Sequence, residues 1–310
     1  MQAVRIHEYG DVSVLRYEDA PMPVVAADEV LVEVHAAAIN PADWQFRQGR
    51  YKDFAPRPMP FILGWDVAGV VHSTGAEVGR WRPGDRVFAM ADMSRNGAYA
   101  QYVAIREEYL APPPTTLPLN HAAGVPLAAL TAWKALFDEG RLQAGQSVLV
   151  HAASGGVGLF ATQLARLAGA RVIATTSAAN AELVRSLGAE QIIDYTAGDF
   201  SDHIHEVDLV IDNVGGDTRT RSWGVLKKGG TLVAVAMPPP DAAIAAQYGV
   251  RTTMNMVRPN GPRLSEIAKL IDEGQLCVVI DGEYSLEQCQ AAHLRSESGH
   301  ARGKIILRVR

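Results

Sequence analysis

The sequence predicts an α/β protein in which a β-rich N-terminal region precedes a doubly wound domain with a parallel sheet. The first observation is the alternation of apolar and polar residues at 29–34, which is typical of a β-strand. The second is a change after Leu117, where helical patterns alternate with short apolar strands up to about Ala236. Strands separated by helices pair in parallel and carry helices on both faces of the sheet. The third is a glycine-containing turn at 152–158, directly after one of these strands.

The N-terminal region contains further short β-type segments. Residues 67–71 form an apolar run bounded by glycines, and residues 86–89 follow a Pro-Gly-Asp turn. Residues 97–103 are expected to form another strand. The three prolines at 112–114 end the region, because proline neither donates to a β-ladder nor continues a helix.

The alternating region and the tail complete the predicted organisation. The expected strands are residues 147–151, 171–175, 191–194, 207–212 and 230–235, with helices at 157–168 and 181–187. The tail shows one helical pattern at 263–273 and a final strand at 304–309. We expect that strand to return to the N-terminal domain, because a short β tail needs a sheet with which to pair. The predicted domains are 1–117 together with 250–310, and 118–249.

Composition limits the class of protein. The 310 residues carry a net charge of −5 with acids and bases interspersed, which does not favour a nucleic-acid partner. No apolar run of about 18 residues predicts a membrane span, and residues 1–8 lack the apolar run of a signal peptide. The two cysteines do not form a disulfide framework. We therefore expect a cytoplasmic protein without a nucleic-acid or membrane partner.

The pattern Ala153-x-Gly155-x-x-Gly158 predicts a dinucleotide site. It has the position of the dinucleotide fingerprint, between a buried strand and a helix, with alanine at the first position. Gly155 would let the backbone approach a pyrophosphate, and Gly158 would let the helix pack closely on the strand. Small residues at such junctions also occur for packing alone. The predicted cofactor-binding residues of the turn are Ala153, Ser154, Gly155, Gly156, Val157 and Gly158.

The loop after the second strand favours NADP over NAD. An NAD site usually has an acid here to bind the ribose 2′-hydroxyl, but residues 175–180 contain no carboxylate. The hydroxyls of Thr176 and Ser177 would tolerate a 2′-phosphate. The same residues are also compatible with a plain Ser/Thr turn. No lysine or arginine stands in the loop, so a charge-assisted phosphate contact is missing.

These residues resemble the medium-chain dehydrogenase/reductase superfamily and, within it, the zinc-independent NADPH:quinone oxidoreductase (zeta-crystallin-like) family. The resemblance covers nearly the whole chain. Its motifs lie at residues 37–43, 63–69, 84–87, 129–133, 151–158, 187–195, 212–216 and 303–307.

The resemblance implies a GroES-like β-barrel domain, joined by the tail, together with a Rossmann domain, and it also implies a homodimer. Zinc-dependent relatives carry Cys where this chain has Asn40 and His where it has Trp65. Their third ligand falls near Leu127, which cannot bind metal. Catalytic zinc needs about three protein ligands, so we expect no zinc. No flavin motif is present either, which leaves direct hydride transfer from NADPH.

The resemblance also implies roles for individual residues. Asn40 and Tyr51 would face the substrate and nicotinamide, with Thr131 near the nicotinamide. Tyr195 would lie near the 2′-phosphate, and Val235 would approach the carboxamide. Asn213, Val214 and Gly215 would line the ribose. Two positions depart from the family pattern: a second active-site tyrosine appears as Gln45, and the usual basic residue is lost near Asn180 and Ala181.

The candidate catalytic residues are Asn40, Tyr51 and Asp43. The Asn40 amide or the Tyr51 hydroxyl would stabilise negative charge on the substrate oxygen, and Tyr51 or water would deliver the proton. Asn40 before Pro41 is also typical of a turn, and Tyr51 between two basic residues is compatible with an exposed aromatic. Asp43 would either orient the loop through backbone N–H groups or lie solvated.

The predicted function is NADPH-dependent, metal-free hydride transfer to a quinone or an α,β-unsaturated carbonyl compound. The alternative is a catalytically idle NADPH-binding protein with a structural or sensing role. The residues alone supply no assured acid–base group that would exclude it.

Overall fold

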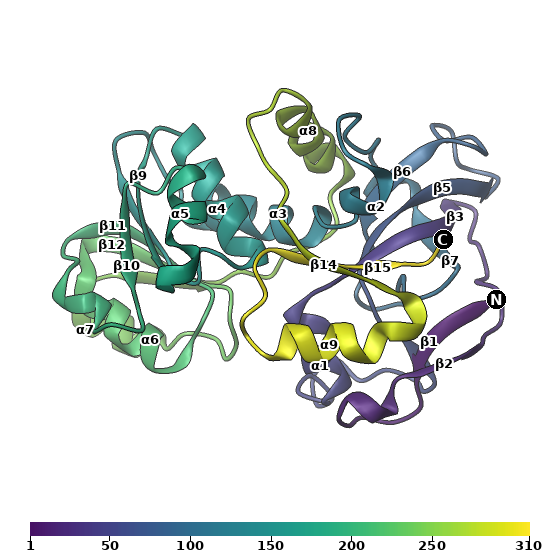
Figure 1. Cartoon of the computed structure of the whole chain (residues 1–310), viewed down its shortest axis with the longest axis horizontal. Coiled ribbons are helices and arrows are strands. Elements are labelled where there is room, and N and C mark those ends of the chain that lie inside the picture. Colours follow the sequence, from purple (N-terminus) through teal and green to yellow (C-terminus); the bar gives the residue numbers. More distant parts are fainter. The chain divides into compact units, whose positions relative to one another are not determined.

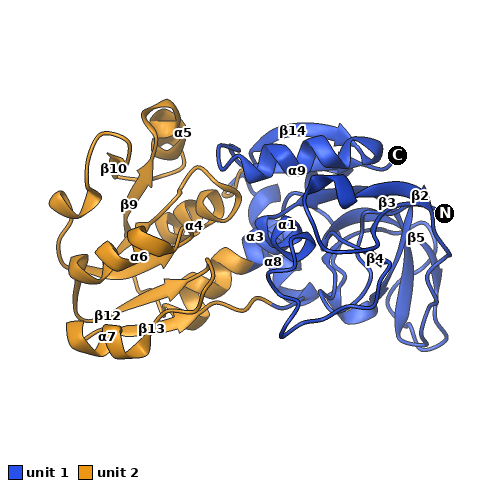
Figure 2. Cartoon of the chain, turned by 90° about the horizontal axis from the view of Figure 1, so that it is seen from below, with its two compact units in different colours: residues 1–130, 258–274, 278–310 blue, residues 131–257, 275–277 orange.

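The computed structural model covers residues 1–310 and divides into two compact units, coloured separately in Figure 2. Unit 1 comprises Met1–Leu130, Arg258–Gly274 and Val278–Arg310, and unit 2 comprises Thr131–Val257 and Gln275–Cys277. Together they make an α/β protein with a GroES-like domain and a Rossmann-type domain.

Unit 1 is built on two sheets. Its strands are β1 (Gln2–Ile6), β2 (Arg16–Asp19), β3 (Glu29–Ile39), β4 (Phe61–Ile62), β5 (Asp66–Thr74), β6 (Arg86–Met90), β7 (Tyr102–Arg106), β14 (Ile280–Ser285) and β15 (Lys304–Arg308). The smaller sheet has the order β2-β1-β4. The larger has the order β14-β15-β3-β5-β6, with β7 also paired to β3.

The tail strand returns to the N-terminal sheet, which confirms the expectation for it. β15 pairs antiparallel with β3, placing Ile305 opposite Ile39, and parallel with β14 on its other edge (Figure 1). The helices of unit 1 are α1 (Pro41–Arg47), α2 (Leu119–Ala122), α8 (Gly261–Asp272) and α9 (Cys289–Glu297). Helix α3 (Pro126–Trp133) begins in unit 1 and ends in unit 2.

Unit 2 is a doubly wound domain, as predicted. Its strands are β8 (Ser147–Val150), β9 (Arg171–Thr176), β10 (Gln191–Asp194), β11 (Val207–Asp212), β12 (Leu226–Ala234) and β13 (Arg251–Met254). All five pairings are parallel, in the order β10-β9-β8-β11-β12-β13. The helices are α4 (Gly156–Leu167), α5 (Ala181–Ser186), α6 (Gly216–Ser222) and α7 (Ala242–Tyr248). The strand order reverses between β8 and β11, where such sheets bind their ligands.

The core of unit 2 holds this sheet in place. Leu149, Ile173 and Val210, one from each of three neighbouring strands, are buried in a cluster that includes Trp223. Each such side chain contributes about 1.5–3 kcal/mol when removed from water. The carboxyl ends of the strands therefore stand on a rigid base.

Several predicted boundaries differ from the structure. Residues 250–257 were expected in the N-terminal domain, but β13 pairs with β12 and lies in unit 2, while unit 1 extends past residue 117 to Leu130. The sequence of β13 is Arg-Thr-Thr-Met, which lacks an apolar run. The strand expected at 97–103 is found instead at Tyr102–Arg106, because Gly97 and Ala98 bond to the backbone of Ile62 and Gly64.

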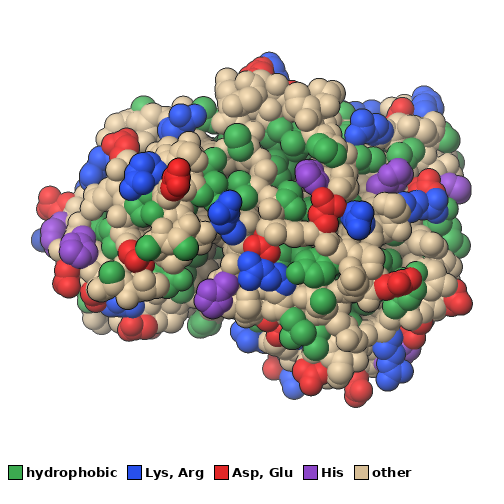
Figure 3. Space-filling model, viewed as in Figure 1, with side chains coloured by type: hydrophobic (Ala, Val, Ile, Leu, Met, Phe, Trp, Pro, Cys, Tyr) green, Lys and Arg blue, Asp and Glu red, His purple; other side chains and the backbone are tan.

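No helix combines the length and apolar character needed to cross a bilayer. On the face shown in Figure 3, basic and acidic side chains are interspersed, with no large area of one sign.

Candidate functional site

The glycine turn joins β8 to α4 with two differently constrained glycines. A Cβ atom at Gly158 would lie 2.3 Å from the Ala152 carbonyl oxygen and 2.7 Å from the Ala153 Cα. At Gly155 the nearest atom would be the same carbonyl oxygen at 3.3 Å. Gly158 is therefore required for helix packing, whereas Gly155 leaves the backbone open. The twelve-residue helix α4 begins here, and its first N–H groups favour an anion.

A cluster of neutral polar side chains lies beside this turn. The Thr176 hydroxyl donates to Ser154 Oγ at 3.0 Å, and Asn180 Nδ2 lies 3.3 Å from both Ser154 Oγ and Ser177 Oγ. The backbone N–H of Tyr195 donates to the Thr176 carbonyl, and the Tyr195 side chain is 53% exposed. The structure thus brings together the residues predicted for the 2′-phosphate. Asn180, which the sequence suggested only as a lost basic position, joins them.

His151 lies buried beneath the turn. Its Nδ1 is 3.0 Å from Thr175 Oγ1, and its Nε2 is 2.9 Å from Ser222 Oγ. Because the Ser222 hydroxyl donates to the Thr218 carbonyl at 2.7 Å, it accepts from His151 Nε2–H. Burial lowers the pKa of His151 to about 4, so the imidazole is neutral at physiological pH. Its role is to tie the turn to β9 and α6.

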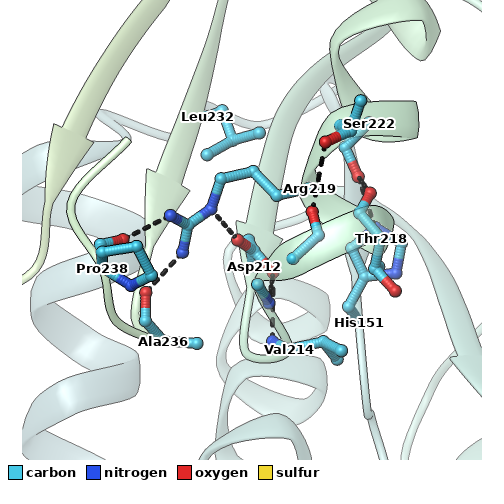
Figure 4. A network of polar contacts seen from close by, with 12 residues as sticks. His151, Asp212, Val214, Thr218, Arg219, Ser222, Leu232, Ala236 and Pro238 are labelled. Atoms are coloured by element: carbon cyan, nitrogen blue, oxygen red, sulfur yellow. Dashed lines mark hydrogen bonds and ion pairs between the residues drawn. The ribbon is translucent and has the colours of Figure 1, made fainter. Parts of the chain in front are cut away.

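An ion pair of unit 2 connects the loops that follow β11 and β12 (Figure 4). Asp212 Oδ1 accepts the backbone N–H groups of Val214 at 3.0 Å and Gly215 at 2.7 Å. Asp212 Oδ2 lies 2.5 Å from Arg219 Nε, and the other Arg219 nitrogens donate to the carbonyls of Ala236 and Pro238.

Both members of this pair are buried, so its hydrogen bonds are made at low local dielectric. They hold the two loops that carry Asn213, Val214, Gly215 and Val235. Sequence reasoning had not singled out this pair. The only signal was an Asp ending a predicted strand, with an Arg seven residues later.

The remaining predicted cofactor residues stand at the same carboxyl edge of the sheet. Asn213 Nδ2 donates to the His151 carbonyl at 2.8 Å, and Asn213 Oδ1 is buried without a hydrogen-bond partner. The Val235 N–H donates to the Asp212 carbonyl at 2.9 Å. The Thr131 carbonyl accepts from Asn255 Nδ2 at 2.8 Å. Val214 is 49% exposed.

In unit 1, Asn40 belongs to a buried network. Its Nδ2 donates to Asp66 Oδ2 at 2.8 Å, and its Oδ1 accepts from Lys304 Nζ at 2.5 Å. Lys304 Nζ also donates to Asp66 Oδ2 at 2.9 Å, while Asp66 Oδ1 accepts the backbone N–H of Leu127 at 2.6 Å. Asn40 Nδ2 also lies 3.5 Å from the Ala38 carbonyl, so this side chain, 3% exposed, directs its amide oxygen and both N–H groups to partners within the protein. Sequence reasoning missed Asp66 and Lys304.

Asp43 is fully buried, so its interpretation as a solvated carboxylate is wrong. Its Oδ2 accepts the Asn40 backbone N–H and the Tyr99 hydroxyl, each at 2.7 Å. Burial raises the pKa of Asp43 to about 7 against the opposing hydrogen bond from Tyr99. Asp43 thus orients the start of α1.

Tyr51 is half-buried and paired. Its hydroxyl donates to Gln45 Oε1, and its ring lies 6.0 Å from the ring of Phe46. Burial raises the pKa of the Tyr51 hydroxyl. Gln45, the departure from the family pattern, therefore fixes the orientation of the Tyr51 hydroxyl.

The positions at which zinc-dependent relatives bind their metal hold an amide, a buried indole and an aliphatic side chain in this chain: Asn40, Trp65 and Leu127. The nearby Asp66 carboxylate is paired with Lys304. No group of three or more His, Cys, Asp or Glu side chains converges in the structure. This donor set does not fit catalytic zinc, which needs about three N, S or O ligands.

Comparison with known proteins places the chain in a family. The alcohol dehydrogenase GroES-like domain family matches residues 26–115, and the zinc-binding dehydrogenase family matches residues 187–307. The mitochondrial NAD(P)H oxidoreductase RTN4IP1 of Mus musculus is 33% identical over 100% of this chain and 89% of its own length. The chloroplastic NADPH-dependent alkenal/one oxidoreductase of Arabidopsis thaliana is 36% identical, over 99% of this chain and 79% of its own length.

A solved structure agrees with these relatives. The quinone oxidoreductase from Coxiella burnetii superposes with a TM-score of 0.93 at 35% identity, covering 100% of this chain and 99% of that one. Fold and glycine turn together define an oxidoreductase of the medium-chain dehydrogenase/reductase superfamily. Within that superfamily, the chain belongs to the family of quinone oxidoreductases and their enone-reducing relatives.

Proposed function

We propose that this protein reduces quinones or α,β-unsaturated carbonyl compounds with NADPH and without a metal. The observation that carries the proposal is the hydrogen bonding of the glycine turn to the polar cluster of Ser154, Thr176, Ser177 and Asn180. The turn leaves backbone N–H groups open for a pyrophosphate, and the adjoining cluster offers hydroxyl and amide groups to a ribose phosphate.

The expected cofactor preference follows from the charge of this polar cluster. The four side chains include no carboxylate that would repel a 2′-phosphate and no cation that would strengthen its binding. We therefore expect NADPH to be preferred over NADH by a modest factor rather than to be the sole cofactor. A direct comparison of KM for the two cofactors tests this.

The chemistry requires a hydride and a proton. Bound NADPH supplies the hydride to an electron-poor carbon of the acceptor, and the acceptor oxygen then takes up a proton. We propose that the Tyr51 hydroxyl, which donates to Gln45 Oε1 in this structure, donates to that oxygen once the acceptor replaces Gln45 as its partner. Asn40 and Asp43 act as positioning residues, because their side chains bond within the protein.

The donor set supports metal independence. An amide, an indole and an aliphatic side chain occupy the positions at which zinc-dependent relatives carry their metal ligands, and the Asp66 carboxylate forms an ion pair with Lys304. We expect a chelator to leave the reductase activity unchanged. Inactivation that added zinc reverses would overturn the proposal.

We further propose a homodimer in which β13 takes part. β13 is an edge strand of the unit 2 sheet, and the unpaired N–H and C=O groups of an edge strand can pair with a strand of another chain. Apolar side chains near this edge are exposed: Ile244 and Tyr248 of α7, and Met256 after β13. Sedimentation of the protein as a monomer would contradict this.

The cytoplasmic location of the protein stays a prediction, to be checked by fractionation of cells.

The decisive experiment is turnover. Purified protein is mixed with NADPH and a panel of quinones and enones, and the absorbance of the reduced nicotinamide is followed. We expect oxidation of NADPH that depends on an acceptor. Tight NADPH binding without turnover on any acceptor would instead favour the idle, NADPH-binding role.

A further inference from the structure

Asn255 is a buried residue at the carboxyl edge of the unit 2 sheet that no sequence motif singled out. It directly follows β13 and is 5% exposed. Its backbone N–H donates to the Ala234 carbonyl at 2.8 Å, and its Nδ2 donates to the Thr131 carbonyl at 2.8 Å. Hydrogen bonds from its backbone N–H and from its side-chain amide nitrogen therefore hold Asn255 in place.

The orientation of this amide is settled by its partner. A backbone carbonyl only accepts hydrogen bonds, so the nitrogen of the amide must face Thr131. The Asn255 Oδ1 then faces away from Thr131, and it is buried without a hydrogen-bond partner. A buried acceptor without a partner is costly, because it has lost its hydrogen bonds to water, so a ligand that supplies a donor would relieve that cost.

The position of Asn255 points to the chemistry of its missing partner. Because β11, β12 and β13 are adjacent and parallel, Asn213, Val235 and Asn255 follow neighbouring strands at one edge. In open α/β sheets, dinucleotides bind outside the carboxyl ends of the strands.

The order of the strands then gives the order of the cofactor along this edge. The phosphate turn follows β8 and the polar cluster proposed for the 2′-phosphate follows β9, so a bound dinucleotide would place its nicotinamide end on the opposite side, towards β12 and β13. Asn213 is bonded to the His151 carbonyl beside the turn, which places its own unpaired Oδ1 nearer the ribose. Asn255 lies furthest towards the nicotinamide end.

We infer that Asn255 Oδ1 accepts a hydrogen bond from the carboxamide N–H of the nicotinamide ring. The inference rests on the proposed NADPH-binding function. It makes Asn255 a cofactor-binding residue that also favours carboxamide dinucleotides over analogues that lack the amide N–H.

The test compares two ligands that differ only in this donor. In the 3-acetylpyridine analogue of NADP⁺ a methyl group replaces the amide nitrogen, so the analogue cannot donate to Asn255. Dissociation constants are measured by calorimetry. The loss of one neutral hydrogen bond raises a dissociation constant roughly 2- to 10-fold, so the wild-type protein should bind NADP⁺ more tightly than the analogue by about this factor.

Three variants make the comparison specific. Asn255→Ala should bind both ligands with nearly equal affinity. Asn255→Asp keeps an oxygen acceptor for the carboxamide but loses the N–H that donates to the Thr131 carbonyl, so it should keep the preference for NADP⁺ while binding both ligands more weakly. Asn213→Ala should weaken both ligands alike, because the ribose hydroxyls are common to both. The compound 2′,5′-ADP lacks the nicotinamide half of the cofactor. All three variants should bind it with the same dissociation constant as the wild type, and this result would show that the adenosine side of the site is intact.

The outcomes separate the inference from the proposed function. A preference for NADP⁺ that persists unchanged in Asn255→Ala would overturn the inference, as would a wild-type protein that binds both ligands equally. A wild-type protein that binds neither NADP⁺ nor 2′,5′-ADP would instead refute the proposed function itself.

Discussion

Replacing the two glycines of the β8–α4 turn should separate cofactor binding from folding. At Gly155 the backbone is extended, with φ −81° and ψ 172°, and a new Cβ would approach only the Ala152 carbonyl oxygen, at 3.3 Å. Valine tolerates extended backbone well. Gly155→Val should therefore fold normally while its side chain occupies the space through which a phosphate reaches the backbone N–H groups.

Gly158 presents the opposite case. A Cβ atom at this position would lie 2.3 Å from the Ala152 carbonyl oxygen and 2.7 Å from the Ala153 Cα, both backbone atoms. Overpacking of this kind costs about 1–3 kcal/mol. Alanine returns up to about 1 kcal/mol through its higher helix propensity. Because both contacts are with backbone atoms, the cost should lie at the upper end of this range, so Gly158→Ala should lower the free energy of unfolding by about 2 kcal/mol.

The size of the binding effect follows from the hydrogen bonds lost. A hydrogen bond from a backbone N–H to a charged group contributes about 1.5–3 kcal/mol. Losing one such bond raises the dissociation constant of NADPH roughly 10- to 100-fold in Gly155→Val.

Both quantities are measurable on the same protein samples. Urea unfolding gives the stability of each variant, and titration with NADPH gives the dissociation constant. The reasoning fails if Gly155→Val binds NADPH as tightly as the wild type. It also fails if Gly158→Ala is as stable as the wild type, since the backbone clash would then not exist.

Three further predictions concern buried and polar groups. Lys304→Met leaves the Asp66 carboxylate buried without its cation and should lower the free energy of unfolding, measured in urea, by about 3–5 kcal/mol. The double variant Asp66→Asn, Lys304→Met should regain about 2 kcal/mol of that loss. Strictly additive losses from the two substitutions would contradict the pairing. The pKa of His151 falls from 6.5 to about 4 on folding, so the stability that depends on the neutral imidazole is present above pH 6.5 and is lost towards pH 4. Between pH 8 and pH 5 the free energy of unfolding of the wild type should fall by about 2 kcal/mol more than that of His151→Gln. Equal losses in the two proteins would refute this. Ser177→Asp should raise KM for NADPH more than KM for NADH by charge repulsion, and an equal rise would show that this loop does not contact the 2′-phosphate.

Much of the fold was predictable from local pattern. The strands expected at residues 191–194 and 207–212 coincide with β10 and β11, because apolar runs bounded by polar and turn residues are a property of the chain itself. β13, β14 and α9 were missed. The sequence of α9, Cys-Gln-Ala-Ala-His-Leu-Arg-Ser-Glu, shows no clear apolar stripe, and the helix is stabilised by burial of Ala292 and His293 within unit 1.

The sequence by itself determined the class of the protein and the position of its dinucleotide turn. Spacing within a strand–turn–helix unit depends on residues close in the chain, so Gly155 and Gly158 could be interpreted without coordinates. What the buried polar groups do was decided only by tertiary structure. Asn40 meets Lys304 across 264 residues, and Asn255 meets Thr131 across 124. Contacts over such separations leave no local pattern, because they arise only when the chain brings distant polar groups out of water and forces them to bond with one another.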